Sequence, residues 1–258
     1  MQNPKSNYTG MLTLLKREVS RFLRVWSQTI VPPIVTSLLF ILIFGYSLGS
    51  RISNIQGISY INYIIPGLLM MGVIISAYAN TSSSLFIAKF QKSIQEYLIA
   101  PLSYWQIVMA LTLAGVLRAL LVGVGILIIS LIATPITISN APILIYFITL
   151  TSFLFSFAGI ITGLWAESFD KMNVFSVFLI TPLTYLGGVF YSINMLPQFW
   201  QNIAKFNPIL YMVDGFRFGF LGISDINIYF SMALLFVLTL IFFIWCLYLF
   251  KKGYKIRS

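Results

Sequence analysis

The sequence is poor in the residues that carry most enzyme and metal chemistry. It contains no histidine, six acidic residues and a single cysteine, Cys246, in 258 residues. One cysteine cannot form a disulfide or a thiolate metal site within one chain, and without histidine the commonest general base and zinc ligand is missing. A Ser-Lys or carboxylate mechanism stays formally open, but no residue spacing indicates one.

Charge of either sign is also scarce. Charged residues make up 9% of the chain and apolar residues 59%, whereas soluble domains carry roughly 25% charged residues. This balance excludes a soluble fold and indicates a membrane protein. The net charge of +10 does not indicate nucleic acid, because the basic residues lie between the apolar runs and are not interleaved with aromatics on a polar face.

Six apolar runs are long enough to cross a bilayer as helices, which requires about 20 residues each. Their predicted bounds are residues 28–49, 60–85, 107–133, 143–165, 172–190 and 228–250. Arg118 is the only ionisable residue well inside a span, and we expect it to snorkel toward the cytoplasmic interface rather than face a substrate. The polar segment 1–10 lacks the apolar core of a signal peptide, so we expect the first span to direct insertion.

The basic residues predict the orientation of these spans. With the N-terminus inside, all of the 16 Lys and Arg residues fall on the cytoplasmic side except Arg51, Arg118, Lys205 and Arg217. The positive-inside rule therefore places both termini in the cytoplasm.

Two polar segments on the predicted cytoplasmic side have helical patterns. The first, within residues 1–27, places five apolar residues at three- and four-residue spacing: Leu12, Leu15, Val19, Phe22 and Trp26. This pattern indicates an interfacial helix, although a basic flank that only orients the first span would look the same. In the second, residues 86–105, five apolar residues mark one face: Ile87, Phe90, Ile94, Tyr97 and Leu98. We expect this amphipathic helix either to dock a partner or to lie on the lipid headgroups, and Pro101 to end it.

The most irregular part of the chain, residues 191–227, is predicted to lie outside. It contains two short helix candidates, residues 198–206 and 209–221, separated by Asn207-Pro208. Asp214 and Arg217 are three apart on the second candidate, where we expect them to form a local ion pair that either holds this outer segment in place or is purely structural.

The sequence also lacks an obvious source of energy. No acidic residue lies clearly inside a span, which argues against a proton- or sodium-driven transporter, although backbone carbonyls can bind sodium. No G-x-x-x-x-G-K-[ST] phosphate-binding loop occurs either. If ATP drives this protein, a separate chain must hydrolyse it.

Residues 181–222, TPLTYLGGVFYSINMLPQFWQNIAKFNPILYMVDGFRFGFLG, carry a more specific signal. They resemble the signature of ABC-2 type transporter permeases, as does the EYLIAPLS run from Glu96 to Ser103, and the resemblance covers the whole chain. The resemblance implies one transmembrane domain over residues 1–258. It would comprise a cytoplasmic interfacial helix (1–27), a six-span bundle (28–250) with a coupling-helix loop (86–105) and a re-entrant outer segment (194–222), and a basic tail (251–258).

The resemblance also implies roles for particular residues. Those expected to contact an ATPase are Lys89, Lys92, Glu96, Tyr97 and Pro101. Those expected to form an outer gate are Gly187, Gly188, Pro197, Asn207, Pro208, Asp214 and Arg217. Those expected to line a substrate path, between the second and fifth spans of two paired chains, are Ser76, Asn80, Phe178, Thr181 and Tyr185.

The implied protein is the permease subunit of an ABC exporter in a bacterial inner membrane. It would pair with a second copy, contact membrane lipid, hold no cofactor itself and rest on a separate ATPase subunit that binds ATP and Mg. Its substrate would be an amphipathic drug, a lipid or a lipid-linked saccharide. The alternatives are an ion-coupled secondary transporter or channel, and an enzyme acting on membrane lipids.

Overall fold

The computed structural model describes residues 8–49 and 54–255. Lys5, Arg51 and Arg257, which contribute to the charge count, lie outside the described residues. The described chain is mostly helical, with one short antiparallel hairpin of β1 (Asn54–Ile55) and β2 (Ile58–Ser59). The predicted all-α class is therefore confirmed.

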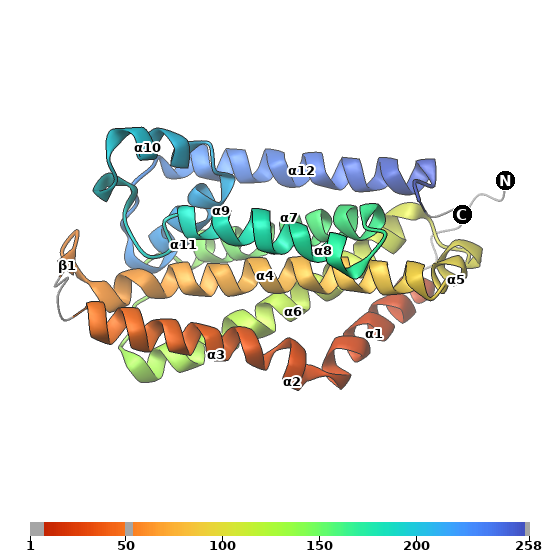
Figure 1. Ribbon diagram of the computed structural model, residues 1–258, viewed down its shortest axis with the longest axis horizontal. Helices are drawn as coiled ribbons and strands as arrows, with labels where there is room; N and C mark the ends of the chain where they lie inside the picture. The colour runs from red at the N-terminus through yellow and green to blue at the C-terminus, as the bar shows by residue number, and fades with distance from the viewer. Residues whose placement is uncertain (1–7, 50–53, 256–258) are drawn as a thin grey trace.

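Five helical stretches are long and apolar enough to cross a membrane. The first joins α2 (Trp26–Thr29), α3 (Val31–Phe40) and the π-helix η1 (Ile41–Leu48), and the others are α4 (Tyr60–Phe90), α6 (Tyr104–Ala133), α7 (Ala141–Trp165) and α12 (Ile228–Lys252). All run roughly along the longest axis of the molecule (Figure 1). In the most apolar window of α4, 83% of the residues are buried, against 22% in α12. Helix α4 is thus the centre of the bundle, packed against α3, α6, α7 and α11.

The segment predicted as the fifth span is shorter and less regular than expected. It consists of α8 (Phe169–Phe175), the π-helix η2 (Ser176–Ile180) and α9 (Thr181–Leu186). Pro182 supplies no N–H to the helix, and the widened turns of η2 precede it. The helix ends before the predicted Phe190, because Gly188 has a φ of 76°, which glycine adopts without strain.

Close backbone approach holds α7 against α4. A Cβ on Gly159 would lie 2.5 Å from the carbonyl oxygen of Tyr78, and one on Gly163 would lie 2.9 Å from that of Ser82. The small-residue spacing of Gly159 and Gly163, four apart on α7, therefore marks a close helix contact.

Arg118 has a different role from the one expected. It is 9% exposed, and its Nη2 donates to the carbonyl oxygen of Thr29, 2.9 Å away. That carbonyl lies four residues before Pro33, which has no N–H to offer it. Arg118 therefore does not snorkel into water but binds the backbone where α2 meets α3.

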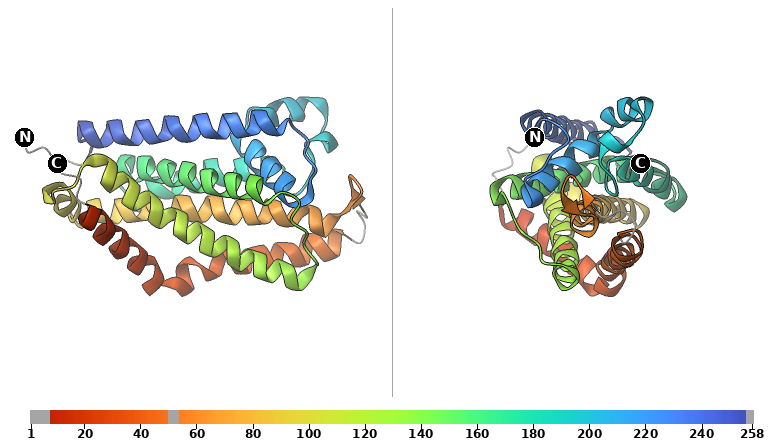
Figure 2. Two further views of the ribbon diagram at one scale, coloured as in Figure 1. Left: turned by 180° about the vertical axis from the view of Figure 1, so that it is seen from behind. Right: turned by 90° about the vertical axis from the view of Figure 1, so that its left-hand side faces the viewer.

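The two ends of the bundle carry different elements. The start of α1 (Tyr8–Arg24), α5 (Ile94–Ile99) and the end of α12 lie at one end, and β1, α10 (Gln198–Lys205) and α11 (Pro208–Leu221) at the other (Figures 1 and 2). A 3-10 turn, η3 (Ile193–Met195), precedes α10. The two predicted short helices, 198–206 and 209–221, are therefore confirmed as elements, and both lie at the end opposite α5.

Candidate functional site

The polar segment after α4 forms two pieces instead of one amphipathic helix. Helix α4 continues to Phe90, a turn follows, and α5 occupies only Ile94–Ile99. Lys92, in the turn, has a φ of 58° that breaks the helix. The predicted single apolar face from Ile87 to Leu98 is therefore wrong, and the side chain of Leu98 lies outside the described residues.

Helix α1 is amphipathic as predicted, but its buried stripe is different. The buried residues are Leu14, Glu18 and Phe22, at four-residue spacing, whereas Leu12 and Trp26 are exposed. Glu18 is thus a carboxyl group on a stripe that packs against the bundle. Glu18 was not among the residues expected on the apolar face, although its four-residue spacing from Phe22 is readable in the sequence.

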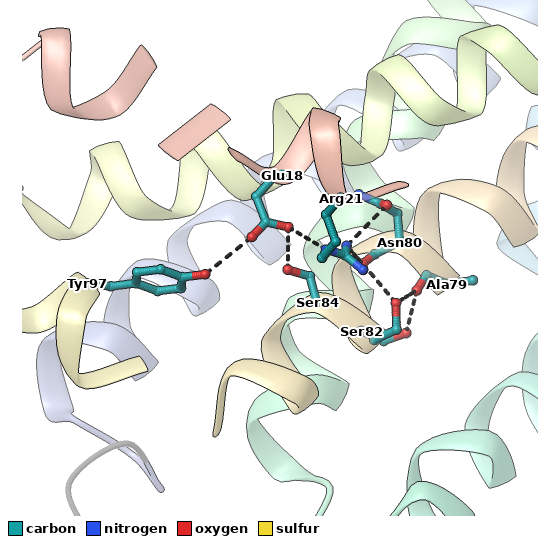
Figure 3. Close-up of polar contacts among 8 residues, drawn as sticks. Glu18, Arg21, Ala79, Asn80, Ser82, Ser84 and Tyr97 are labelled. Atoms are coloured by element: carbon teal, nitrogen blue, oxygen red, sulfur yellow. Dashed lines mark hydrogen bonds and ion pairs between the residues drawn. The ribbon is translucent and has the colours of Figure 1, made fainter. Parts of the chain in front are cut away.

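Glu18 connects three helices through a group of side chains that we call the Glu18 cluster: Glu18, Arg21, Asn80, Ser84 and Tyr97. The Oε2 atom of Glu18 accepts from Arg21 Nε at 3.1 Å and from Ser84 Oγ at 2.5 Å (Figure 3). The Oε1 atom of Glu18 accepts from the Tyr97 hydroxyl at 3.2 Å. Arg21 Nη2 also donates to the Asn80 carbonyl oxygen at 3.2 Å. One carboxyl group therefore joins α1 to α4 and α5.

Tyr97 keeps its proton in this arrangement. Its burial, followed by the negative charge of Glu18, raises the pKa of Tyr97 to about 12. At neutral pH the hydroxyl is therefore a hydrogen-bond donor, as the contact with Glu18 requires.

A groove runs beside the cluster between α1 and the chain from α5 to Leu102. Its volume is about 370 Å³, and its lining includes Arg17, Glu96, Tyr97 and Pro101. Arg17 and Glu96 form a 3.0 Å ion pair across it, with side chains 50% and 67% exposed. A pair so exposed stabilises little by itself, about 0–1 kcal/mol. It leaves both charges accessible to another protein.

The five residues expected to contact an ATPase separate into two groups. Glu96, Tyr97 and Pro101 line the groove. Lys89 does not, because its ammonium group donates to the carbonyl oxygens of Gly163, Leu164 and Ala166 and so caps the end of α7. Lys92 is exposed in the turn between α4 and α5.

The loop after α7 is tied to the end of the chain. Glu167 accepts from Lys171 at 2.6 Å and from Lys255 at 2.5 Å. The hydrogen bonds from these two lysines lower the pKa of Glu167 to about 2. The basic tail, through Lys255, therefore lies against this loop.

Arg217, the one cation among the predicted gate residues, is deeply buried. It is 2% exposed, donates through Nη2 to the Gly188 carbonyl oxygen at 2.5 Å, and lies 4.0 Å above the Tyr63 ring. Both contacts favour a buried guanidinium, since the carbonyl accepts its protons and the ring face is negative. Arg217 therefore joins α11 to α4 and to the turn after α9.

Asp214 does not pair with Arg217, contrary to the prediction. It accepts from Ser224 Oγ at 2.6 Å and from the backbone N–H of Asp225 at 2.9 Å and of Ile226 at 3.2 Å. The four salt bridges found within residues 8–49 and 54–255 do not include these two residues. Asp214 points to the loop before α12, whereas Arg217 points into the bundle, so the two stabilise different contacts.

The other predicted gate residues surround the same turn. Asn207 caps α11 by accepting from the Ile209 N–H, and it donates to the Leu183 carbonyl oxygen at 2.6 Å. Pro208 begins α11, Pro197 precedes α10, and Gly187 and Gly188 end α9. The predicted gate residues thus all lie at the end of the bundle opposite α5, from α9 to α11.

The five predicted path residues are not on one surface of a single chain. Ser76 and Asn80 are buried in α4, whereas Phe178 is 75% exposed and Tyr185 is 41% exposed. Thr181 bonds to the Ser176 carbonyl oxygen, five residues earlier in η2. Any common path requires either a second chain or a movement of α8–α9 away from α4.

Fold and site together define a multi-pass α-helical membrane protein. At one end of its bundle the Glu18 cluster joins α1 to α4 and α5, and at the other end lie the short helices α10 and α11. A family model described as ABC-2 type transporter matches residues 9–221. The chain belongs to this family.

Individual relatives agree with that assignment. The chain is 43% identical over 251 residues to the inner membrane transport permease YadH of Escherichia coli, covering 97% of this chain and 98% of that protein. It is 24% identical over 178 residues to nodulation protein J of Sinorhizobium fredii, covering 67% and 66%. With nodulation protein J of Rhizobium meliloti it shares 21% over 216 residues, covering 82% and 81%. Family membership makes this chain a membrane subunit of an ABC transporter.

Proposed function

We propose that this chain is the permease subunit of an ATP-driven exporter in a bacterial inner membrane. Two copies pair, and each rests on a separate ATPase subunit that binds ATP and Mg. The observation that supports this most directly is the groove between α1 and α5, with the exposed Arg17–Glu96 pair on its wall. It offers a mechanical contact to a partner, joined through Tyr97 and Glu18 to the central helix.

The proposed topology has six crossings with both termini in the cytoplasm. Residues 169–186 rise about 27 Å at 1.5 Å per residue, which nearly matches a hydrocarbon core of ~30 Å. With α8–α9 as the fifth of six crossings in chain order, α10 and α11 re-enter the membrane from outside. Their broken backbone is covered by contacts such as those of Asn207 and Arg217, which a membrane requires.

Force applied at α5 has a continuous route to the outer end. Tyr97 and Ser84 both bind Glu18, so a displacement of α5 or α1 pulls on the cytoplasmic end of α4. Helix α4 has 31 residues and extends about 46 Å. At its outer end the Tyr63 carbonyl oxygen accepts from Arg217. A tilt of α4 would thereby loosen α11 and open the outer end.

The cargo we propose is amphipathic: a drug, a lipid or a lipid-linked saccharide. Phe178 and Tyr185 would face a second copy across the pair axis. Ser76 and Asn80 would join the path when α8–α9 moves from α4. Similarity to an inner membrane transport permease supports transport as the activity.

Reconstitution with an ABC-type ATPase that co-purifies with this chain from its native membrane tests the proposal. The purified chain alone should hydrolyse no ATP, and the complex in proteoliposomes should hydrolyse ATP and move a fluorescent amphiphile with no ion gradient. Transport that follows a proton or sodium gradient without nucleotide would instead identify a secondary transporter. Lipid-modifying activity of the lone chain in detergent would identify an enzyme.

Charge exchange across the groove tests the coupling contact. Arg17→Glu and Glu96→Arg should each lower ATP-driven transport several-fold while the chain still inserts and folds, because an exposed pair contributes only ~0–1 kcal/mol to stability. Lys171→Glu, at an exposed pair on the other cytoplasmic loop, is the matched control. Equal loss in all three variants would exclude a specific role for the groove.

A further inference from the structure

A second cavity lies within a single chain, away from the groove, and reaches Pro208 of the predicted gate at one end. It has a volume of about 360 Å³, within the range of ligand pockets, and is lined by residues of α4, α7, α8, η2, α9, α11 and α12. Its walls include Ala158 of α7, Met212 of α11 and Phe242 of α12. No charged residue lines it. The cavity is therefore suited to an apolar occupant.

The rim of the cavity faces the lipid side of the bundle. Leu179 and Trp245, on its two flanking segments, are 48% and 47% exposed. Both segments belong to the transmembrane region: α12 is a candidate span, and η2 is part of the proposed fifth crossing. The medium next to this rim is hydrocarbon, so the available apolar occupant is an acyl chain.

One polar group in the cavity wall lacks a partner. Tyr78 is 3% exposed and lines the cavity, and its hydroxyl lies beside that of Thr162 without a hydrogen bond of good geometry. The neighbouring Thr162 hydroxyl donates to the Ala158 carbonyl oxygen at 3.0 Å. A buried, unpaired hydroxyl costs about 1–3 kcal/mol. An occupant with a hydrogen-bond acceptor at this point would remove that cost.

The depth of Tyr78 indicates which acceptor this is. Arg21, on the interfacial helix α1, donates to the Asn80 carbonyl oxygen. Tyr78 lies two residues further along α4, about 3 Å deeper by helical rise. An interfacial helix lies at the boundary between headgroups and acyl chains, the depth at which the ester carbonyls of a phospholipid occur.

We propose that this cavity binds one acyl chain of a cytoplasmic-leaflet phospholipid, with its ester carbonyl accepting a hydrogen bond from Tyr78. The chain extends along α7 and α12 toward Met212 and separates α8–α9 from α12. It is a resident lipid of each permease chain and not the exported cargo.

Photocrosslinking of the full chain in nanodiscs tests the site. The probe is ester-linked phosphatidylethanolamine with a diazirine on one acyl chain. Crosslinks should concentrate on residues 154–162 and 238–245, and Ala158→Phe, which fills the cavity, should reduce them about tenfold. Ile244→Phe, at an exposed position of α12 that does not line the cavity, should leave them unchanged. Equal crosslinking in the wild type and in both variants would overturn the proposal.

Two further arms test the carbonyl contact and the resident state. The wild type should retain the ester-linked probe several-fold better than its ether-linked analogue, and Tyr78→Phe should remove that preference without losing the crosslinks. No preference in the wild type would refute the carbonyl contact. In the complex with its ATPase, crosslinking should persist during ATP turnover. Depletion of the probe by turnover would instead make it cargo. Crosslinking in nanodiscs needs no ATPase, so the lipid site can be supported or refuted independently of the proposed transport function.

Discussion

A few buried polar side chains connect helices that are far apart in the sequence. Glu18 and Arg217 are each 2% exposed, and each bonds to residues on other elements. Removing one partner from such a site leaves the others buried and unsatisfied, which costs more than the bond itself contributes. These residues therefore have effects on stability out of proportion to their number.

Glu18→Ala should destabilise the protein by about 1–3 kcal/mol, because it leaves the Ser84 and Tyr97 hydroxyls without their acceptor. Glu18→Gln, which keeps an acceptor oxygen, should cost less. Thermal unfolding in detergent measures both. Glu96→Gln, at the exposed pair, serves as the control and should change stability by less than about 1 kcal/mol. A loss in Glu96→Gln equal to that in Glu18→Ala would contradict this account.

The raised pKa of Tyr97 predicts that the stability of the folded protein falls at alkaline pH. Its folded pKa of about 12 lies above the ordinary value near 10, so the neutral form is favoured in the folded state. Its contribution to stability should be complete below about pH 10 and decline as the pH rises toward 12. The difference in melting temperature between wild type and Tyr97→Phe, followed from pH 7 to 11, measures this. A difference that stays constant up to pH 11 would show that the pKa is not raised.

At the scale of elements, the close contact of α4 with α7 determines the bundle. Gly159 brings the two backbones together beside Tyr78, at the point where the proposed lipid cavity begins. Glycine at a helix interior costs up to about 1 kcal/mol in helix propensity relative to alanine. Here the packing it permits outweighs that cost.

Gly159→Ala should therefore destabilise the protein by about 1–3 kcal/mol, since the added Cβ would meet backbone oxygen that cannot move aside. Gly125→Ala is the matched control. Its added Cβ meets only the end of the flexible Ile34 side chain, so we expect no loss or a small gain. Melting temperatures of the two variants, measured side by side, decide the matter. Equal destabilisation would mean that α7 can shift away from α4.

At the scale of the whole molecule, the two ends of the bundle are chemically different. One end carries the Glu18 cluster and an exposed ion pair, and the other carries α10 and α11 folded over the turn after α9. Helix α7 ends beside α5 and α12 begins beside α10 and α11, so the chain must return across the bundle between them, which the proposed topology assigns to residues 169–186.

Single cysteines test that crossing. In a Cys246→Ala background, Gln198→Cys should react with a membrane-impermeant maleimide added outside intact cells. Asp170→Cys should react only after permeabilisation. Both positions are exposed, Asp170 at the start of α8 and Gln198 after α9, at the start of α10. Labelling of both from the same side would reduce the topology to five crossings. The Cys246→Ala background alone should stay unlabelled.

Much of the fold was predictable from the sequence because it depends on local composition. Apolar runs near 20 residues, prolines and glycines predicted the helices and the break at Asn207-Pro208. The prediction of one amphipathic helix within residues 86–105 was wrong, because its apolar spacing continues across Lys92 while a φ of 58° at Lys92 breaks the helix. The contacts of Lys89 with the α7 carbonyl oxygens were not predictable either, because Gly163 lies far from Lys89 in the sequence.

The sequence by itself determined that this is a helical membrane protein with a permease-like outer segment, since hydropathy and motif spacing are properties of neighbouring residues. Only the tertiary structure decided the partners of the buried polar groups. Glu18 meets Ser84 and Tyr97, Arg118 meets Thr29, and Arg217 meets Gly188 instead of Asp214. A buried charge takes whichever donor or acceptor the packed helices bring to it, and that is determined by the packing and not by distance along the chain.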